Sequence, residues 1–297
     1  MKKIIYTSFL TTLFLLISFT FYLSTFGIET SKFNNIIIKE IKKKDPNIKL
    51  QINKIKVKFD VRKFQIYLKT LEPQIIYQDV KIPIKEINIY SKIISILKSK
   101  NEINQAIILI ENFNIQDLQK LVVRIKPSNL KTYLLNNLNS GEIEKILINV
   151  KLDENSNIYD YQVNGSVKKV NVKVFDGLSI KNVNLNFISD KNLTLINSIS
   201  ANYQGISISN GSTSLMRNKE IRIEGKFNSQ FNLNEDSVNK LLAKLNIKFL
   251  ERNKVKAQGS LLHKFLFTID ENFKLIDYEY KSNGSISESQ IILKDVF

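Results

Sequence analysis

Apolar and polar residues alternate along most of the chain after residue 49, which is the pattern of a β-strand with one buried face. In the segment IKVKFD at 55–60, every second residue is apolar. Further alternating runs lie at 64–68, 82–89, 146–150, 170–174, 183–187, 206–208 and 221–223. We therefore predict a mainly β fold, built as a long curved antiparallel sheet with one apolar and one polar face.

Three segments interrupt this alternation with helical spacing of their apolar residues. They are KIISILKSK at 92–100 with Ser91 as its cap, two helices within 114–137 that Pro127 separates, and 235–245 with Asn234 as its cap. Short helices of this kind are expected to cover the ends or flanks of the sheet.

One phrase occurs twice, as LDENSNIYDYQVNGSV from Leu152 and as IDENFKLIDYEYKSNGSI from Ile269. Asp-Glu-Asn favours a tight polar turn, and Asp-Tyr begins an alternating strand in both copies. The repeat predicts equivalent hairpins in two successive sheet modules. The Asn-Gly-Ser triplets that begin at Asn164, Asn210 and Asn283 are interpreted as turns.

The first thirty residues differ from the rest. Residues 4–28 contain no charged side chain, and a helix of this length measures about 37 Å, enough to cross a hydrocarbon core of about 30 Å. No small-residue cleavage site follows a short apolar core, so an uncleaved anchor is favoured over a removed signal peptide. Lys2 and Lys3 favour a cytoplasmic N-terminus with the body outside the cytoplasm.

A short amphipathic helix is expected at 31–44, ended by Asp45-Pro46. Two positions suit it equally, on the membrane surface or across the end of the following sheet. The predicted organisation is an anchor at 1–28, this helix and a linker at 29–48, and two β modules at 49–150 and 151–297, the second of which is expected to be cut short.

Charge and composition restrict the function. The net charge is +16 and there is no cysteine, which excludes disulfides and thiolate metal sites. The lysines are spread along the chain rather than gathered in one block, so they favour a solvated basic surface or attraction to anionic lipid headgroups over nucleic-acid binding.

No residues with the spacing of a catalytic site are found. His263 is the single histidine, and Ser260, three positions away on the same strand, points to the other face. The acidic pairs Asp153-Glu154 and Asp270-Glu271 lie in predicted turns and lack the pattern of a calcium loop. We predict neither an enzyme nor a bound cofactor or metal.

Two segments resemble a known family. INKIKVKFDVRKFQIYLKTLEPQIIY at 52–77 and INIYSKIISILKSKNEINQAIILIENFNIQDLQKLV at 87–122 are similar in pattern and order to the N-terminal region of AsmA-like proteins, above all the YhdP-type branch. The resemblance implies an inner-membrane anchor and a periplasmic, U-shaped β-groove that carries phospholipid towards the outer membrane, with envelope proteins as further partners. Members are usually longer, so this chain is expected to be a piece of a longer one.

The resemblance and the alternation together predict a lipid groove whose apolar side stays uncovered. The side chains expected to line it are Ile55, Val57, Phe59, Phe64, Ile66, Leu68, Val170, Val172, Val174, Leu185 and Phe187. The alternative is an anchored structural or assembly factor whose apolar faces are closed between two packed sheets.

Overall fold

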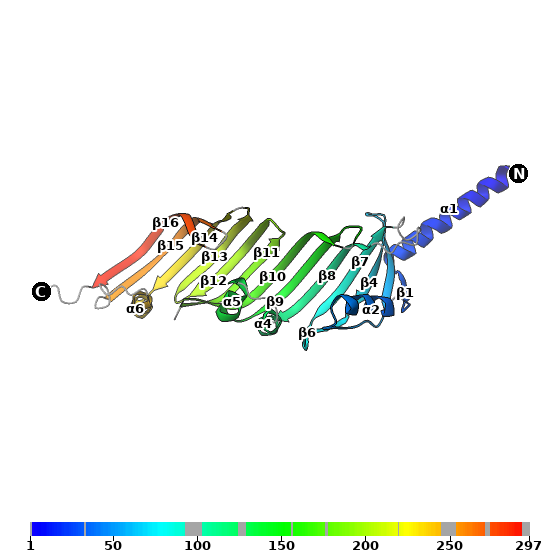
Figure 1. Ribbon diagram of the computed structural model, residues 1–297. Helices are drawn as coiled ribbons and strands as arrows, with labels where there is room; N and C mark the ends of the chain where they lie inside the picture. Colours follow the sequence, from blue (N-terminus) through cyan, green and yellow to red (C-terminus); the bar gives the residue numbers. More distant parts are fainter. Residues whose placement is uncertain are drawn as a thin grey trace. The chain divides into compact units, whose positions relative to one another are not determined.

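The computed structural model describes residues 2–32, 34–92, 103–123, 129–155, 157–175, 178–218, 220–244, 254–270 and 274–292. Figure 1 shows their arrangement. The described helices are α1 (Lys2–Thr25), α2 (Asn34–Lys44), α4 (Ile115–Val122), α5 (Asn129–Asn137) and α6 (Glu235–Lys244). The first strands are β1 (Ile28–Thr30), β2 (Ile48–Gln51), β3 (Ile55–Asp60), β4 (Gln65–Leu71), β5 (Gln74–Tyr77), β6 (Val80–Ile82), β7 (Ile84–Lys92) and β8 (Ile103–Asn114). The later ones are β9 (Leu138–Leu152), β10 (Ile158–Phe175), β11 (Leu178–Ser189), β12 (Leu193–Tyr203), β13 (Ile206–Arg217), β14 (Ile221–Leu233), β15 (Lys254–Ile269) and β16 (Leu275–Ile292).

Most strands belong to one sheet. Its thirteen strands follow the order β1-β3-β4-β7-β8 and then β9 to β16 in sequence, and β2, β5 and β6 form a second sheet of three strands. The strand pairs with a defined register are antiparallel. The predicted mainly β, antiparallel fold is confirmed.

The chain divides into two compact units. Unit 1 contains residues 1–111 and 147–161, and unit 2 contains residues 112–146 and 162–297.

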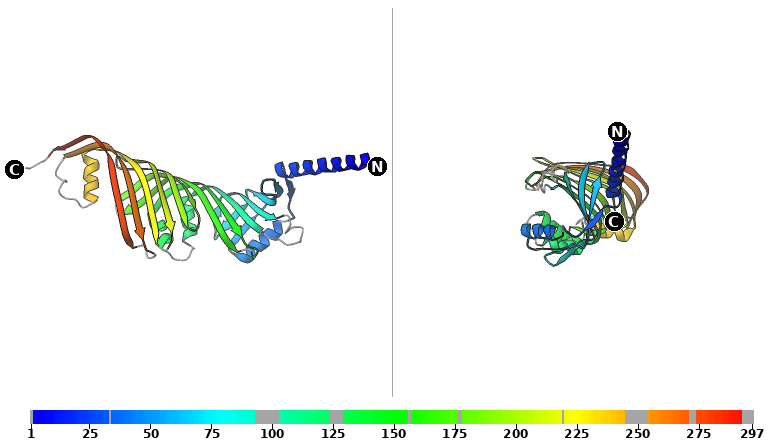
Figure 2. Two further views of the ribbon diagram at one scale, coloured as in Figure 1. Left: turned by 90° about the horizontal axis from the view of Figure 1, so that it is seen from above. Right: turned by 90° about the vertical axis from the view of Figure 1, so that its right-hand side faces the viewer.

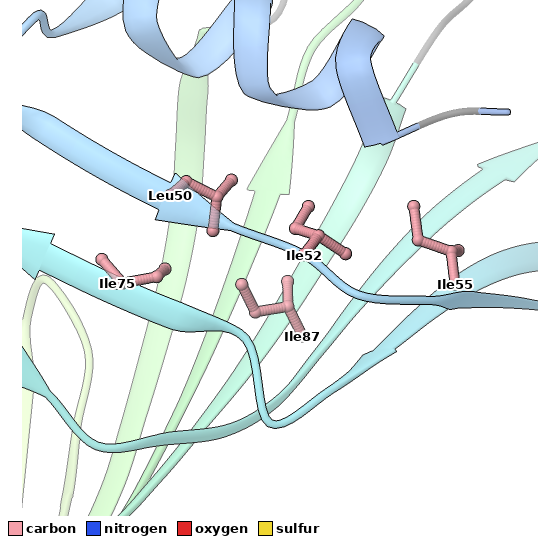
Figure 3. Close-up of a cluster of buried hydrophobic side chains, with 5 residues drawn as sticks. All are labelled: Leu50, Ile52, Ile55, Ile75 and Ile87. Atoms are coloured by element: carbon pink, nitrogen blue, oxygen red, sulfur yellow. The ribbon is translucent and has the colours of Figure 1, made fainter. Parts of the chain in front are cut away.

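Unit 1 has a closed core between two layers. Leu50 and Ile75 come from β2 and β5 of the small sheet, Ile52 follows β2, and Ile55 and Ile87 come from the large sheet. Figure 3 shows these five side chains gathered together. Apolar side chains of α2, among them Ile37 and Ile41, pack against this cluster. Ile37 and Ile41 are half-buried against protein, which agrees with a position of this helix on the following sheet.

The other face of the large sheet in unit 1 is polar, with two tyrosines at its centre. The rings of Tyr67 and Tyr90 stack with centroids 4.9 Å apart, and Lys63 Nζ lies 4.3 Å from the centre of the Tyr90 ring. Lys69 and Glu86 form an ion pair of 2.5 Å beside them. Burial, with a smaller contribution from the neighbouring phenol and carboxylates, raises the pKa of Tyr90 to about 12.

Helix α1 is long and apolar enough to cross a membrane, by length and composition. Gly27 lies just after the end of this helix. Its φ of +72° suits glycine, and its N–H donates to the carbonyl of Tyr22 at 3.1 Å. Lys58 from β3 donates to the carbonyl of Thr25 at 3.0 Å, so a cation stabilises the carbonyl end of the helix.

The predicted helices within 114–137 and 235–245 are confirmed. The Asn114 side chain accepts from the N–H of Gln116 at the start of α4, and the Asn234 side chain accepts from the N–H of Ser237 at the start of α6, each at 2.9 Å. In Figure 1, α4, α5 and α6 lie near the lower ends of the strands. The helix expected at 92–100 lies outside the described residues, except for Lys92, which belongs to β7.

Both copies of the repeated phrase form the same turn. The N–H of Asp153 donates to the carbonyl of Asn157 at 2.9 Å, and the N–H of Asp270 donates to that of Lys274 at 3.0 Å. Each aspartate side chain also accepts the N–H four residues ahead, at 2.8 Å. The hydrogen bond from the Asn157 N–H lowers the pKa of Asp153. The hydrogen bonds at the ends of both turns agree with the turns that the repeat predicts, and Asp153 and Asp270 accept backbone N–H groups there.

The Asn-Gly-Ser prediction is wrong. All three triplets lie inside strands, at 164–166 in β10, 210–212 in β13 and 283–285 in β16.

Candidate functional site

In unit 2 the strand register places most of the apolar residues of the strands from β10 to β16 on one side of the sheet. Neighbours across the strands include Val167 and Leu185, Phe187 and Ile196, and Phe267 and Tyr278. We call this side the apolar face. Its members are Val163, Val167, Val170, Val172, Ile180, Val183, Leu185, Phe187, Ile196, Ile199, Ala201, Tyr203, Ile206, Ile208, Leu215, Ile221, Ile223, Phe227, Phe231, Ala257, Leu261, Phe265, Phe267, Ile269, Tyr278, Tyr280 and Ile286.

The continuity of the apolar face depends on four β-bulges. Lys169, Asn182, Ser198 and Asn210 each have φ between +52° and +54°, and each lies at a shift of register in successive strands from β10 to β13. A bulge adds one residue to its strand, so the apolar residues beyond it return to the same side, and the strand bends. The line of bulges keeps the face apolar while it increases the local twist.

The opposite side of the same strands is polar. Asn186 and Asn197 are neighbours there, as are Glu224 and Leu266. Ile188 and Leu195 form an apolar pair on this side and are 42% and 41% exposed, and Leu262 and Leu266 also lie on it. A hollow of about 680 Å³ lies over β12 to β16, and its lining combines leucines such as Leu195 and Leu266 with charged side chains such as Glu224 and Lys264.

The residues expected to line a groove fall in two places. In unit 1, Ile55, Val57, Phe59, Ile66 and Leu68 share one face of β3 and β4. Ile55 is 0% exposed and belongs to the core cluster, and Phe59 is also buried. Ile55 and Leu68 therefore pack in the core that α2 and the small sheet close, whereas Val57 and Ile66 are half-buried outside that cluster.

Phe64 does not belong to a strand. It lies in the turn before β4 with φ of +52° and is 72% exposed, with its ring edge-on to Phe59 at 5.5 Å between centroids. The alternation predicted a strand position for Phe64, but because Phe64 lies in the turn, its side chain does not belong to the apolar face of β3 and β4.

The remaining candidates belong to unit 2. Val170, Val172, Leu185 and Phe187 are all on the apolar face. Val170 is buried, and the other three are half-buried. Val174 lies in β10, and its side chain is outside the described residues.

The apolar face of unit 2 is covered less than that of unit 1. Its described residues contribute no second sheet. Helix α6 packs on β14 and β15 through its buried Val238. Phe113, Ile115, Val122, Ile143 and Val170 are also buried in this unit. Interior side chains of the apolar face such as Leu185 and Phe267 stay half-buried.

The glycines inside the strands of unit 2 make room for large side chains of neighbouring strands. A Cβ on Gly165 would lie 2.5 Å from Phe187 Cζ, and one on Gly225 would lie 2.5 Å from Phe265 Cζ. In both cases the glycine and the ring are register partners. The rings therefore lie across the backbone of the neighbouring strand, which makes the apolar face shallow and smooth at these positions.

Sequence reasoning missed a polar cluster within the apolar face. His263 is 8% exposed; its Nε2 lies 2.7 Å from Ser229 Oγ and its Nδ1 lies 2.5 Å from Tyr280 Oη. The Phe227 ring stacks on the imidazole with centroids 4.4 Å apart. Ser260 is on the other side of β15, as expected. Register pairing of β14, β15 and β16 brings the three groups together, and no local sequence signal indicated it.

The described residues contain no group of three or more His, Asp or Glu side chains able to hold a metal ion. Comparisons of the chain with protein-family models, with curated proteins and with solved structures each found no match. The resemblance to AsmA-like proteins stays a prediction.

Proposed function

We propose that this chain is an AsmA-like protein, anchored in the inner membrane by α1, that binds or conducts phospholipid along its apolar face in the periplasm. The observation that carries the proposal is the apolar face of unit 2, which continues through seven strands from β10 to β16 and has no second sheet over it among the described residues.

The size of the face supports an acyl-chain ligand. Seven strands at about 4.8 Å spacing extend about 29 Å, whereas one acyl chain spans about 15 Å, half of a hydrocarbon core of about 30 Å. Exposing two acyl chains, roughly 30 methylenes at about 0.8 kcal/mol each, to water costs about 25 kcal/mol. A continuous apolar surface removes much of that cost.

A matched pair of variants tests the proposal. Phe187 and Ile196 are neighbours on the apolar face, and Ile188 and Leu195 are neighbours one residue further along the same two strands, on the polar side. The full-length chain is purified from membranes in mild detergent, and bound phospholipid is measured by native mass spectrometry and by extraction. Phe187→Asp with Ile196→Asp should lose most of the bound phospholipid, because carboxylates in the acyl track are costly to desolvate.

Ile188→Asp with Leu195→Asp should keep the phospholipid, and circular dichroism checks that both proteins are folded. Equal retention by the two double variants would contradict the proposal, as would a wild-type chain that carries no phospholipid in repeated preparations.

A second function is favoured by unit 1. Its apolar face is sealed by α2 and the small sheet around a residue with no exposure, Ile55. A membrane-anchored structural or assembly factor of the cell envelope needs such closed cores and no lipid. Absence of lipid from a folded wild-type chain would support this function instead.

A further inference from the structure

The cluster of Ser229, His263 and Tyr280 is a polar group placed within an otherwise apolar area. His263 is flanked on its own face by the uncharged side chains of Phe227, Leu261 and Phe265, and its register partner in β16 is Ser282, which is also uncharged. The nearest lysines along the strands, such as Lys264, point to the other side. Burial lowers the pKa of His263, which favours the neutral imidazole.

A count of protons shows that the neutral cluster is incomplete. Ser229, Tyr280 and a neutral imidazole together carry three polar hydrogens, and the two contacts within the cluster use two of them. If Nδ1 carries the proton, Nδ1 donates to Tyr280, Ser229 donates to Nε2, and the Tyr280 O–H is left over. If Nε2 carries it, Nε2 donates to Ser229, Tyr280 donates to Nδ1, and the Ser229 O–H is left over. In both tautomers one hydroxyl hydrogen needs an acceptor from outside the cluster.

The position of this hydroxyl selects the acceptor. It belongs to the apolar face, and Tyr280 is 54% exposed, so a ligand on that face can reach the cluster. A neutral donor among aromatic rings suits an uncharged acceptor, because bringing an anion to such a place costs more desolvation than one neutral hydrogen bond returns. An acyl ester carbonyl is an uncharged acceptor attached directly to hydrocarbon.

We propose that Ser229, His263 and Tyr280 form a binding point for the acyl ester carbonyl of a lipid that lies on the apolar face. The inference rests on the proposed lipid function and adds to it a preferred position along the face and a preference for ester-linked over ether-linked lipids. One neutral hydrogen bond of ordinary net strength predicts about a 2- to 10-fold preference.

The experiment compares two lipids that differ only in this acceptor. The full-length chain in detergent is offered equal amounts of dioleoyl phosphatidylcholine and its dialkyl ether analogue, and the bound ratio is read by native mass spectrometry. The wild-type chain should carry about 2- to 10-fold more of the ester lipid.

The test variant is Ser229→Ala with His263→Phe and Tyr280→Phe. It removes all three donors and keeps two aromatic rings, and replacing every partner of a hydrogen-bonded group by apolar side chains is tolerated better than removing one. It should bind as much total lipid as the wild type, in an ester to ether ratio near one. The control is Tyr278→Phe, on the same face of the same strand and outside the cluster, which should keep the preference.

The outcomes separate the two proposals. Bound lipid without an ester preference in the wild type, or a preference that survives in the triple variant, overturns the binding point and leaves the lipid function intact. Release of free fatty acid from the ester lipid also overturns it, since Ser229 would then act as a nucleophile. Absence of bound lipid from the folded wild type overturns both proposals.

Discussion

The contact between Gly165 and Phe187 gives a sharp test of how the apolar face is built. A Cβ on Gly165 would lie 2.5 Å and 2.6 Å from Cζ and Cε1 of Phe187, whereas carbon atoms in contact are ordinarily about 3.5–4.0 Å apart. Gly165→Ala therefore forces the ring to move by about 1 Å, and overpacking of this kind costs about 1–3 kcal/mol. Alanine recovers about 0.5–1 kcal/mol because glycine is unfavourable inside a strand.

The expected result is a net loss of about 1–2 kcal/mol in the local stability of β10 and β11. Native-state hydrogen exchange of the full-length chain measures this free energy strand by strand, and every 1.4 kcal/mol corresponds to tenfold faster exchange of the globally protected amides. In a Phe187→Ala background the ring is absent, so adding Gly165→Ala should be neutral or stabilising by up to about 1 kcal/mol.

Equal destabilisation in both backgrounds would refute this reasoning. The requirement for glycine would then come from the other close neighbour, the carbonyl oxygen of Lys145 at 3.1 Å, and the ring would be incidental.

Three further predictions concern other parts of the molecule. Ile55→Ala should lower the stability of β3 and β7, measured by hydrogen exchange, by about 2–5 kcal/mol, because it opens a cavity at a residue with no exposure. The control Val61→Ala, at an exposed turn position, should change the same stability by less than about 0.5 kcal/mol. Because the pKa of His263 lies below its ordinary value of 6.5, the unfolded chain binds more protons as the pH falls below about 7, so stability should decrease from pH 7 to 5; a His263→Phe chain with an unchanged slope would contradict this. Tyr90 should ionise near pH 12 in an absorbance titration at high pH, with that step missing in Tyr90→Phe, and its contribution to stability should be present below pH 10 and decrease as the pH rises towards 12.

The sequence was sufficient for features that depend on neighbouring residues. Alternation identified the strands and their antiparallel sheet, Asn234 identified the start of a helix, and the repeated Asp-Glu-Asn phrase identified two equivalent turns. In each case the signal and the structure lie within a few residues of each other, because backbone geometry and capping are local.

The local pattern gave a wrong prediction where a glycine makes room for a side chain that is distant in the sequence. Asn-Gly-Ser is a common turn sequence, but Gly165 accommodates a ring that comes from 22 positions further along the chain, at Phe187. Nothing in the triplet itself distinguishes these two roles, because the deciding contact is made across strands.

Tertiary structure alone decided which apolar surfaces are covered and which polar groups meet. Ile55 and Leu185 have the same alternating surroundings in the sequence, yet only Ile55 lies beneath a second layer, which comes from β2, β5 and α2. Ser229, His263 and Tyr280 come from three strands and meet because the register of β14, β15 and β16 brings them together. Period-two alternation determines that a strand has an apolar side, whereas the path of the rest of the chain determines what lies against that side.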